Sequence, residues 1–129
     1  MPLYDIVIAK TLVAQGEYEL VTGSARRDSK NLQWESKDHA AIFNLLDIDR
    51  HFIRSPTGQT TEWGPLDCDQ YRINVVELDR VEDYKPSSPD EPPIREARSK
   101  YEQSLECFVK FAIDPVNPSV AVVSIHQSR

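Results

Sequence analysis

The chain has 129 residues, of which 40% are hydrophobic and 28% are charged. Its length predicts a single domain over residues 1–129, and its hydrophobic content excludes wholesale disorder. The formal net charge of −6 argues against a protein that neutralises nucleic-acid phosphates with clustered Lys and Arg, so no nucleic-acid partner is expected.

The sequence shows no signal peptide and no membrane span. The early apolar run at residues 6–9 is short and is followed by Lys10. We therefore expect a soluble, cytoplasmic protein without a membrane partner. Cys68 and Cys107 are the two cysteines, and in a reducing compartment they are expected to remain free thiols.

The first third of the chain predicts short strands separated by polar turns. Residues 3–13 carry apolar side chains on both faces of an extended strand, and residues 17–22 alternate as a half-exposed hairpin partner would. Residues 23–31 are polar and predict a loop. Residues 32–34 predict another short strand, with Trp34 in the core.

Residues 38–54 allow two interpretations. As a helix, the segment has Asp38 at its N-cap, apolar residues at helical spacing and Pro56 as a stop. As two strands, it alternates on both sides of a turn at residues 47–49. Helix propensity favours the first interpretation and the β-rich surroundings favour the second, so the sequence leaves both open.

The second half of the chain predicts the centre of a sheet. Residues 71–78 alternate as a strand, and the acidic, proline-rich residues 77–91 predict a surface excursion. Apolar residues at helical spacing predict a short helix near residues 94–103. Residues 105–113 and 120–125 alternate on both sides of a proline-containing turn and predict a buried hairpin.

About seven short strands with turns between them predict a mainly β fold, an antiparallel β-sandwich with one short helix near residues 94–103. If residues 38–54 are helical, the fold becomes α+β, with that helix lying across one sheet.

Two acidic pairs and one histidine are the residues that could carry chemistry. Asp47 with Asp49 and Asp67 with Asp69 each place two carboxylates at i, i+2, but neither pair matches a calcium-binding loop, so no metal site is expected. His51 near the first pair could be a carboxylate-oriented base. No serine stands in a nucleophile motif, and no cofactor motif is present. Neighbouring carboxylates should raise the pKa of Cys68.

The candidate binding residues are Trp63, Glu62 and Tyr71. Trp63 stands in a loop of Thr, Gly and Pro, with Glu62 beside it and Tyr71 a few residues further on. Loops on a rigid scaffold are where binding residues concentrate.

The sequence favours a non-enzymatic binding or interaction module that uses its long loops, residues 55–66 and 80–93. Its partner would be a protein or a small ligand, and a homo-oligomer is possible. One alternative is a small hydrolase that uses His51 and the acidic pairs. A second alternative is an acidic inhibitor that mimics nucleic acid.

Overall fold

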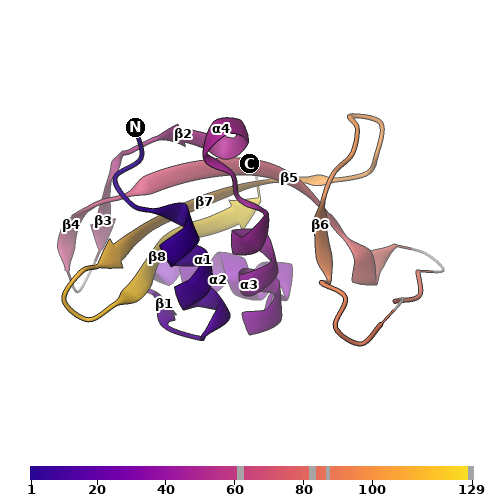
Figure 1. Ribbon diagram of the computed structural model, residues 1–129, viewed down its shortest axis with the longest axis horizontal. Helices are drawn as coiled ribbons and strands as arrows, with labels where there is room; N and C mark the ends of the chain where they lie inside the picture. The colour runs from indigo at the N-terminus through magenta and orange to yellow at the C-terminus, as the bar shows by residue number, and fades with distance from the viewer. Residues whose placement is uncertain (61–62, 82–83, 87, 128–129) are drawn as a thin grey trace.

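The computed structural model describes residues 1–60, 63–81, 84–86 and 88–127. Four helices lie in the first half of the chain and most strands in the second (Figure 1). The helices are α1 (Ile6–Ala14), α2 (Gly23–Leu32), α3 (Ser36–Leu45) and α4 (Ile48–His51), with a 3-10 turn, η1, at Leu78–Arg80. The strands are β1 (Tyr18–Leu20), β2 (Phe52–Arg54), β3 (Thr57–Thr60), β4 (Gly64–Asp67), β5 (Asp69–Glu77), β6 (Ile94–Glu96), β7 (Leu105–Asp114) and β8 (Ser119–Gln127).

Six of the strands form one main sheet in the order β1-β8-β7-β5-β2, and β6 pairs with the far end of β5. The β1–β8 pair is parallel and the other pairs are antiparallel. β3 and β4 form a separate two-stranded sheet. The mainly β class is confirmed, with 37% strand against 29% helix among the described residues. Helices rather than a second large sheet cover the main sheet, so the α+β form of the prediction describes this arrangement.

The predicted central hairpin is β7–β8. Val109 and Phe111 on β7 are 0% exposed, and Val120 and Val122 on β8 are 1% exposed, which confirms that all four are buried. The ring of Phe111 stacks on Tyr71 at 5.8 Å between centroids and lies 5.3 Å from the ring of Phe43 on α3. Helices α1 and α3 pack on this face of the sheet and complete the main core.

The predicted strand at residues 3–13 is wrong, because this segment forms α1. Asp5 caps the helix by accepting a hydrogen bond from the amide of Val7 at 2.8 Å. The buried residues recur at helical spacing: Ile6, Ala9, Leu12 and Val13. A segment that is apolar all round fits a period of two as well as a period of 3.6, so alternation alone could not identify the helix.

The predicted loop at residues 23–31 is also wrong, because it forms α2. Thr22 accepts from the amide of Ala25 at 3.0 Å and caps the helix. α2 buries Ala25, Ser29 and Leu32, and its only strongly apolar residue stands at its last position, so residues 23–31 gave no hydrophobic signal. The helix ends at Leu32, and Gln33 in the left-handed region (φ 60°) turns the chain so that Trp34 is buried outside any strand.

Residues 38–54 are mostly helical but contain both predicted kinds of structure. They hold most of α3, all of α4 and the short strand β2. The first turn of α3 is fixed by a capping box between Glu35 and Asp38. The predicted helix near residues 94–103 is wrong. Ile94–Glu96 pair with β5 instead, and Arg95 forms an ion pair with Glu102 that folds the following loop back.

In the part of the chain that the structure describes, no helix is long and apolar enough to cross a membrane.

Candidate functional site

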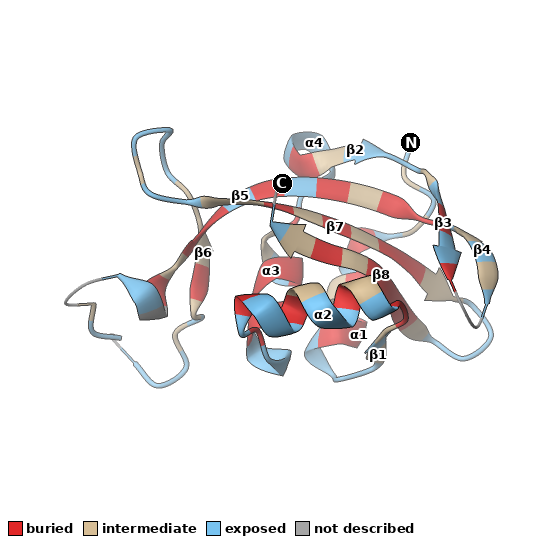
Figure 2. Cartoon of the chain, turned by 180° about the vertical axis from the view of Figure 1, so that it is seen from behind, coloured by how far each residue is buried: buried red, intermediate tan, exposed pale blue. Residues whose placement is uncertain are grey.

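The two faces of the main sheet are covered differently. Helices α1 and α3 cover one face. On the other face the β3–β4 hairpin covers one end of the strands, and α2, in front of the sheet in Figure 2, packs against β8. Gly58 of β3 approaches so closely that a Cβ atom there would lie 2.9 Å from Cγ1 of Val123. Glycine is therefore required for the hairpin to pack over Val123 and Cys68.

Away from the hairpin and α2, alternate residues of β5 and β7 on this second face are exposed or partly exposed (Figure 2), and we call this part of the sheet the open face. Residues paired directly across neighbouring strands point to the same side, so Gln70 lies beside Lys110, Arg72 beside Phe108, and Asn74 beside Glu106. The open face consists of Arg54, Gln70, Arg72, Asn74, Glu106, Phe108, Lys110 and His126.

The open face is locally basic in a chain whose net charge is −6. Arg54, Arg72 and Lys110 bring three cations, whereas Glu106 is the one carboxylate among the eight residues. None of the three cations forms an ion pair within the described part of the chain. The Nε of Arg54 donates to Oε1 of Gln70 at 3.2 Å, which holds the guanidinium over this face.

An aromatic pair lies next to these cations. The rings of Phe108 and His126 are 5.6 Å apart between centroids with an interplanar angle of 32°, and both side chains are partly exposed. The Nδ1 of His126 is 2.9 Å from the carbonyl oxygen of Gln127. A carbonyl only accepts, so Nδ1 carries the hydrogen, and Nε2 of the neutral ring is left as an acceptor.

Of the residues predicted to bind, Trp63 is exposed and Tyr71 does not reach the surface. Trp63 is at the β3–β4 turn and is 43% exposed, and its amide donates to Oγ1 of Thr60. Tyr71 is 0% exposed and packs in the main core, where burial raises its pKa to about 12. Tyr71 therefore has no surface to offer a ligand in this structure. Glu62 lies outside the described residues.

His51 is held by structural contacts and is 6% exposed. Its Nδ1 accepts from the amide of Asp47 at 2.9 Å, so Nε2 carries the hydrogen and donates to Oε2 of Glu96 at 2.7 Å. Burial, and then the neighbouring Arg50, lower the pKa of His51, which fits this neutral form. The imidazole ties α4 to β6 and has no free lone pair for general-base chemistry.

The two acidic pairs also serve the fold. Asp47 caps α4 by accepting from the amide of Asp49 at 2.8 Å. Asp69 is 0% exposed and accepts from the amides of Leu3 and Tyr4 and from the hydroxyl of Ser55, so it anchors the segment that precedes α1. Among the described residues, no group of three or more His, Cys, Asp or Glu is placed to hold a metal ion.

Cys68 and Cys107 are both free and buried. Burial raises the pKa of the Cys68 thiol, and Asp67 and Asp69 add to this shift. The predicted direction is confirmed, but desolvation is the larger cause. Burial likewise raises the pKa of Cys107 to about 12. Neither thiol is an activated nucleophile.

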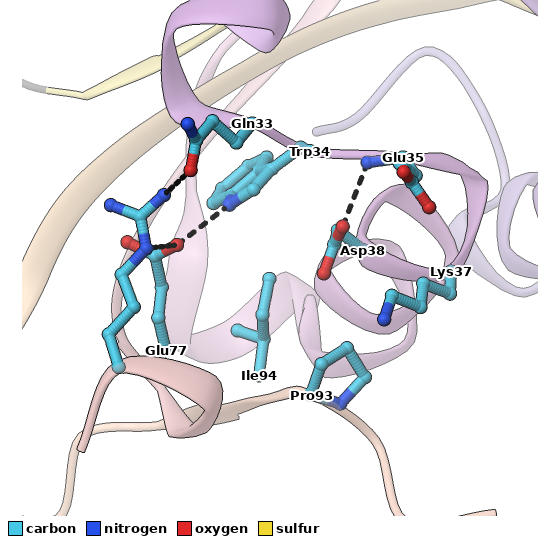
Figure 3. A pocket seen from close by; sticks show the side chains of 9 residues that line it. Gln33, Trp34, Glu35, Lys37, Asp38, Glu77, Pro93 and Ile94 are labelled. Atoms are coloured by element: carbon cyan, nitrogen blue, oxygen red, sulfur yellow. Dashed lines mark hydrogen bonds and ion pairs between the residues drawn. The ribbon is translucent and has the colours of Figure 1, made fainter. Parts of the chain in front are cut away.

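A separate cavity of about 310 Å³ lies between the start of α3 and η1 (Figure 3). Its polar groups bind one another: Nε1 of Trp34 donates to Glu77 at 3.2 Å, and Arg80 contacts both Glu77 and Gln33. These contacts join the α2–α3 corner to the end of β5. The cavity is therefore part of a structural junction, in which these four side chains already bind one another.

The open face was not predicted from the sequence, although the alternation of its residues on two strands can be recognised there. Polar residues at positions 70, 72 and 74 and a mixed set at 106, 108 and 110 alternate with buried residues on two predicted strands. Their clustering depends on the β5–β7 register, and His126 joins them only through the pairing of β8 with β7. A period of two assigns residues to a face but does not say which strands are neighbours.

Comparisons of the chain with protein-family models, with curated protein sequences and with solved structures give no match.

Proposed function

We propose that this protein is a binding module whose open face holds single-stranded nucleic acid. One observation carries the proposal: three cations without ion-pair partners among the described residues lie on the same side of the sheet as a partly exposed aromatic pair. Cations hold the phosphates of a single strand, and aromatic rings stack on its bases. The three cations and the two rings therefore favour a ligand that carries both phosphates and bases.

The proposal departs from the expectation drawn from the net charge. That expectation concerns the whole molecule, whereas association depends on the local potential at the binding surface. Arg54, Arg72 and Lys110 lie together, while several acids elsewhere cap helices or pair with arginine. An acidic protein can therefore present a basic face, and the remaining negative charge keeps nucleic acid away from its other surfaces.

A single strand suits this surface better than a duplex does. The ring of Phe108 can stack only on a base that is splayed away from a partner strand. Trp63 is an exposed ring at the turn of the β3–β4 hairpin, which covers one end of this face, and we propose that it offers a second stacking ring. Trp63, predicted as a binding residue, thereby keeps a binding role within this proposal. A cytoplasmic location would give the protein access to RNA.

The experiment measures fluorescence polarisation of a labelled 12-nucleotide RNA with the wild-type protein and with an Arg72→Glu/Lys110→Glu variant. The variant should bind at least tenfold more weakly. Its slope of log affinity against log salt concentration should be smaller by about 1.4, because each phosphate contact on a single strand contributes about 0.7.

A matched control is Lys37→Glu/Lys85→Glu, which changes the net charge equally at two exposed lysines away from the open face. This control should bind within about threefold of the wild type, because distant exposed charges are largely screened. Equal losses in both variants would show that only the net charge matters. The absence of RNA binding by the wild-type protein at low salt would remove the proposal.

A second candidate function is cleavage of the bound RNA, and the tautomer of His126 favours it. Its Nδ1–H is held by a backbone carbonyl, so Nε2 can accept the proton of a 2′-hydroxyl. The deprotonated oxygen would attack the adjacent phosphorus and displace the 5′-oxygen, which takes a proton from water, giving a 2′,3′-cyclic phosphate and a 5′-hydroxyl end. Nearby cations would stabilise the extra charge on the phosphate.

Incubation with RNA and with DNA of the same sequence separates binding from cleavage. Cleavage requires RNA to be cut while DNA, which lacks the 2′-hydroxyl, remains intact. His126→Gln, which keeps a polar side chain, should abolish the cutting and retain binding within about fivefold. Intact RNA after prolonged incubation with wild-type protein would leave binding alone as the function.

A further inference from the structure

The open face has two chemically different ends. Arg54 and Lys110 lie at the end next to the β3–β4 hairpin, Arg72 and Phe108 in the middle, and Asn74 and Glu106 at the end next to β6. Successive rows are about 6.6 Å apart, because a strand rises about 3.3 Å per residue. A ligand that stacks on Phe108 therefore has Asn74 and Glu106 within reach of its edge.

Asn74 and Glu106 are direct partners in the β5–β7 register, and both side chains are at least partly exposed. No hydrogen bond or ion pair of either side chain is found in the described part of the chain. Several other acids, such as Asp69 and Glu96, are occupied by contacts within the fold. The two side chains are thus available to a ligand.

The structure also leaves space beyond this pair. A cavity of about 1060 Å³ begins at Val76, the next residue on the same side of β5, and extends between the loops on either side of β6. Ser104 and Gln127 line it from the start of β7 and the end of β8. The cavity thus begins one row beyond Asn74 and Glu106 on the same two strands.

From this placement we propose that Asn74 and Glu106 form a subsite that selects a base with an exocyclic amino group, cytosine or adenine. The inference rests on the proposed nucleic-acid function and names the bases that the open face prefers. An ionised carboxylate only accepts hydrogen bonds, so Glu106 suits the amino group of cytosine or adenine and repels the carbonyl oxygen at the same position of uracil. The Asn74 amide can both donate and accept, so it can complete a second contact to either base.

The test compares three labelled RNA decamers: all uridine, and two in which the central four nucleotides are cytidines or adenosines. The wild-type protein should bind both substituted decamers at least about fivefold more tightly than the uridine decamer, which is the lower end of what one good base-edge contact discriminates. The readout is the ratio of affinities, so a general change in phosphate attraction cancels.

Glu106→Gln should reduce this ratio to within about twofold, because a glutamine amide can turn to donate to the uracil carbonyl. Arg72→Ala should weaken binding to all three decamers by a similar factor and preserve the ratio. Glu17→Gln, at an exposed position before β1, removes the same charge elsewhere and should also preserve it.

The outcomes separate the subsite from the function on which it rests. Equal affinity of the wild type for all three decamers would overturn the subsite while leaving nucleic-acid binding intact. A preference that survives Glu106→Gln unchanged would also overturn it. If no decamer binds, the proposed function itself fails.

Discussion

The two faces of the main sheet come from the same strands and differ in almost every physical property. On β7, Val109 and Phe111 point into the helix-covered face and are 0% exposed, while Phe108 and Lys110 point to the open face and stay partly exposed. The covered face satisfies its side chains by packing, and the open face leaves cations and rings unsatisfied. Alternate residues of one strand thus serve stability and binding separately. Substitutions on the covered face should change stability, and substitutions on the open face should change binding.

The largest effect is expected on the covered face. Phe111→Ala removes a ring that contacts Tyr71 and Phe43 and should lower the free energy of unfolding by about 3 to 5 kcal/mol, the usual range for a core aromatic. Urea denaturation measures this change. A loss below roughly 1 kcal/mol would show that the helix-covered face is not the main core.

A pH titration sharpens the same contrast, because Tyr71 lies on the covered face. Burial raises its pKa from 10.0 to about 12, so the folded protein keeps the phenol neutral where the unfolded chain ionises it. Its contribution to stability is complete below pH 10 and is lost as the pH rises towards 12. Between pH 10 and pH 12, the free energy of unfolding should fall less in Tyr71→Phe than in the wild type. An equal fall in both proteins would show that other groups cause it.

The hydroxyl of Tyr71 has no hydrogen-bond partner among the described residues. Removing a buried, unpaired hydroxyl relieves a desolvation cost. Tyr71→Phe should therefore be neutral or stabilising at pH 7.

Trp63 is exposed at the β3–β4 turn, and its removal should hardly affect folding. At 43% exposure the indole is only partly packed, so Trp63→Ala should keep the melting temperature within about 2 °C of the wild type. The same variant should weaken RNA binding about threefold or more, as expected for a stacking ring. A drop of many degrees in differential scanning calorimetry would instead identify Trp63 as part of the hairpin's packing.

The smallest expected effect is that of metal removal. Asp47 and Asp69 already accept hydrogen bonds within the fold. Melting in excess EDTA and in excess calcium should therefore give the same midpoint. A rise of several degrees with calcium would reveal a cation bound to the folded state.

The predictions from sequence succeeded where one face of a segment is strongly apolar and the other is not. β5 and β7 show this pattern and bury alternate residues over most of their length, whereas β8 is apolar on both faces and buries residues 120–123 together. α1 is apolar all round and was predicted as a strand. α2 buries Ala25, Ser29 and, at its last position, Leu32, so residues 23–31 show no apolar periodicity and were predicted as a loop.

The candidate site could be predicted only in part, for a different physical reason. Trp63 was found because a large ring in a polar loop is unusual. Arg72, Lys110 and His126 come from three separate strands, and their proximity is fixed by long-range pairing that local patterns do not encode. Tyr71 was grouped with Trp63 by closeness in sequence, although its strand turns the ring to the opposite face.

The most direct test of the two-face account is a titration of isotopically labelled protein with a single-stranded RNA decamer, followed by amide chemical shifts. The account predicts that the large shifts cluster at residues 54, 70–74, 106–110 and 124–126, with α1 and α3 unaffected. Arg72→Glu/Lys110→Glu should remove those shifts while the spectrum remains that of the folded protein. Shifts that instead cluster on α1 and α3, or that spread evenly over the molecule, would contradict the assignment of binding to the open face.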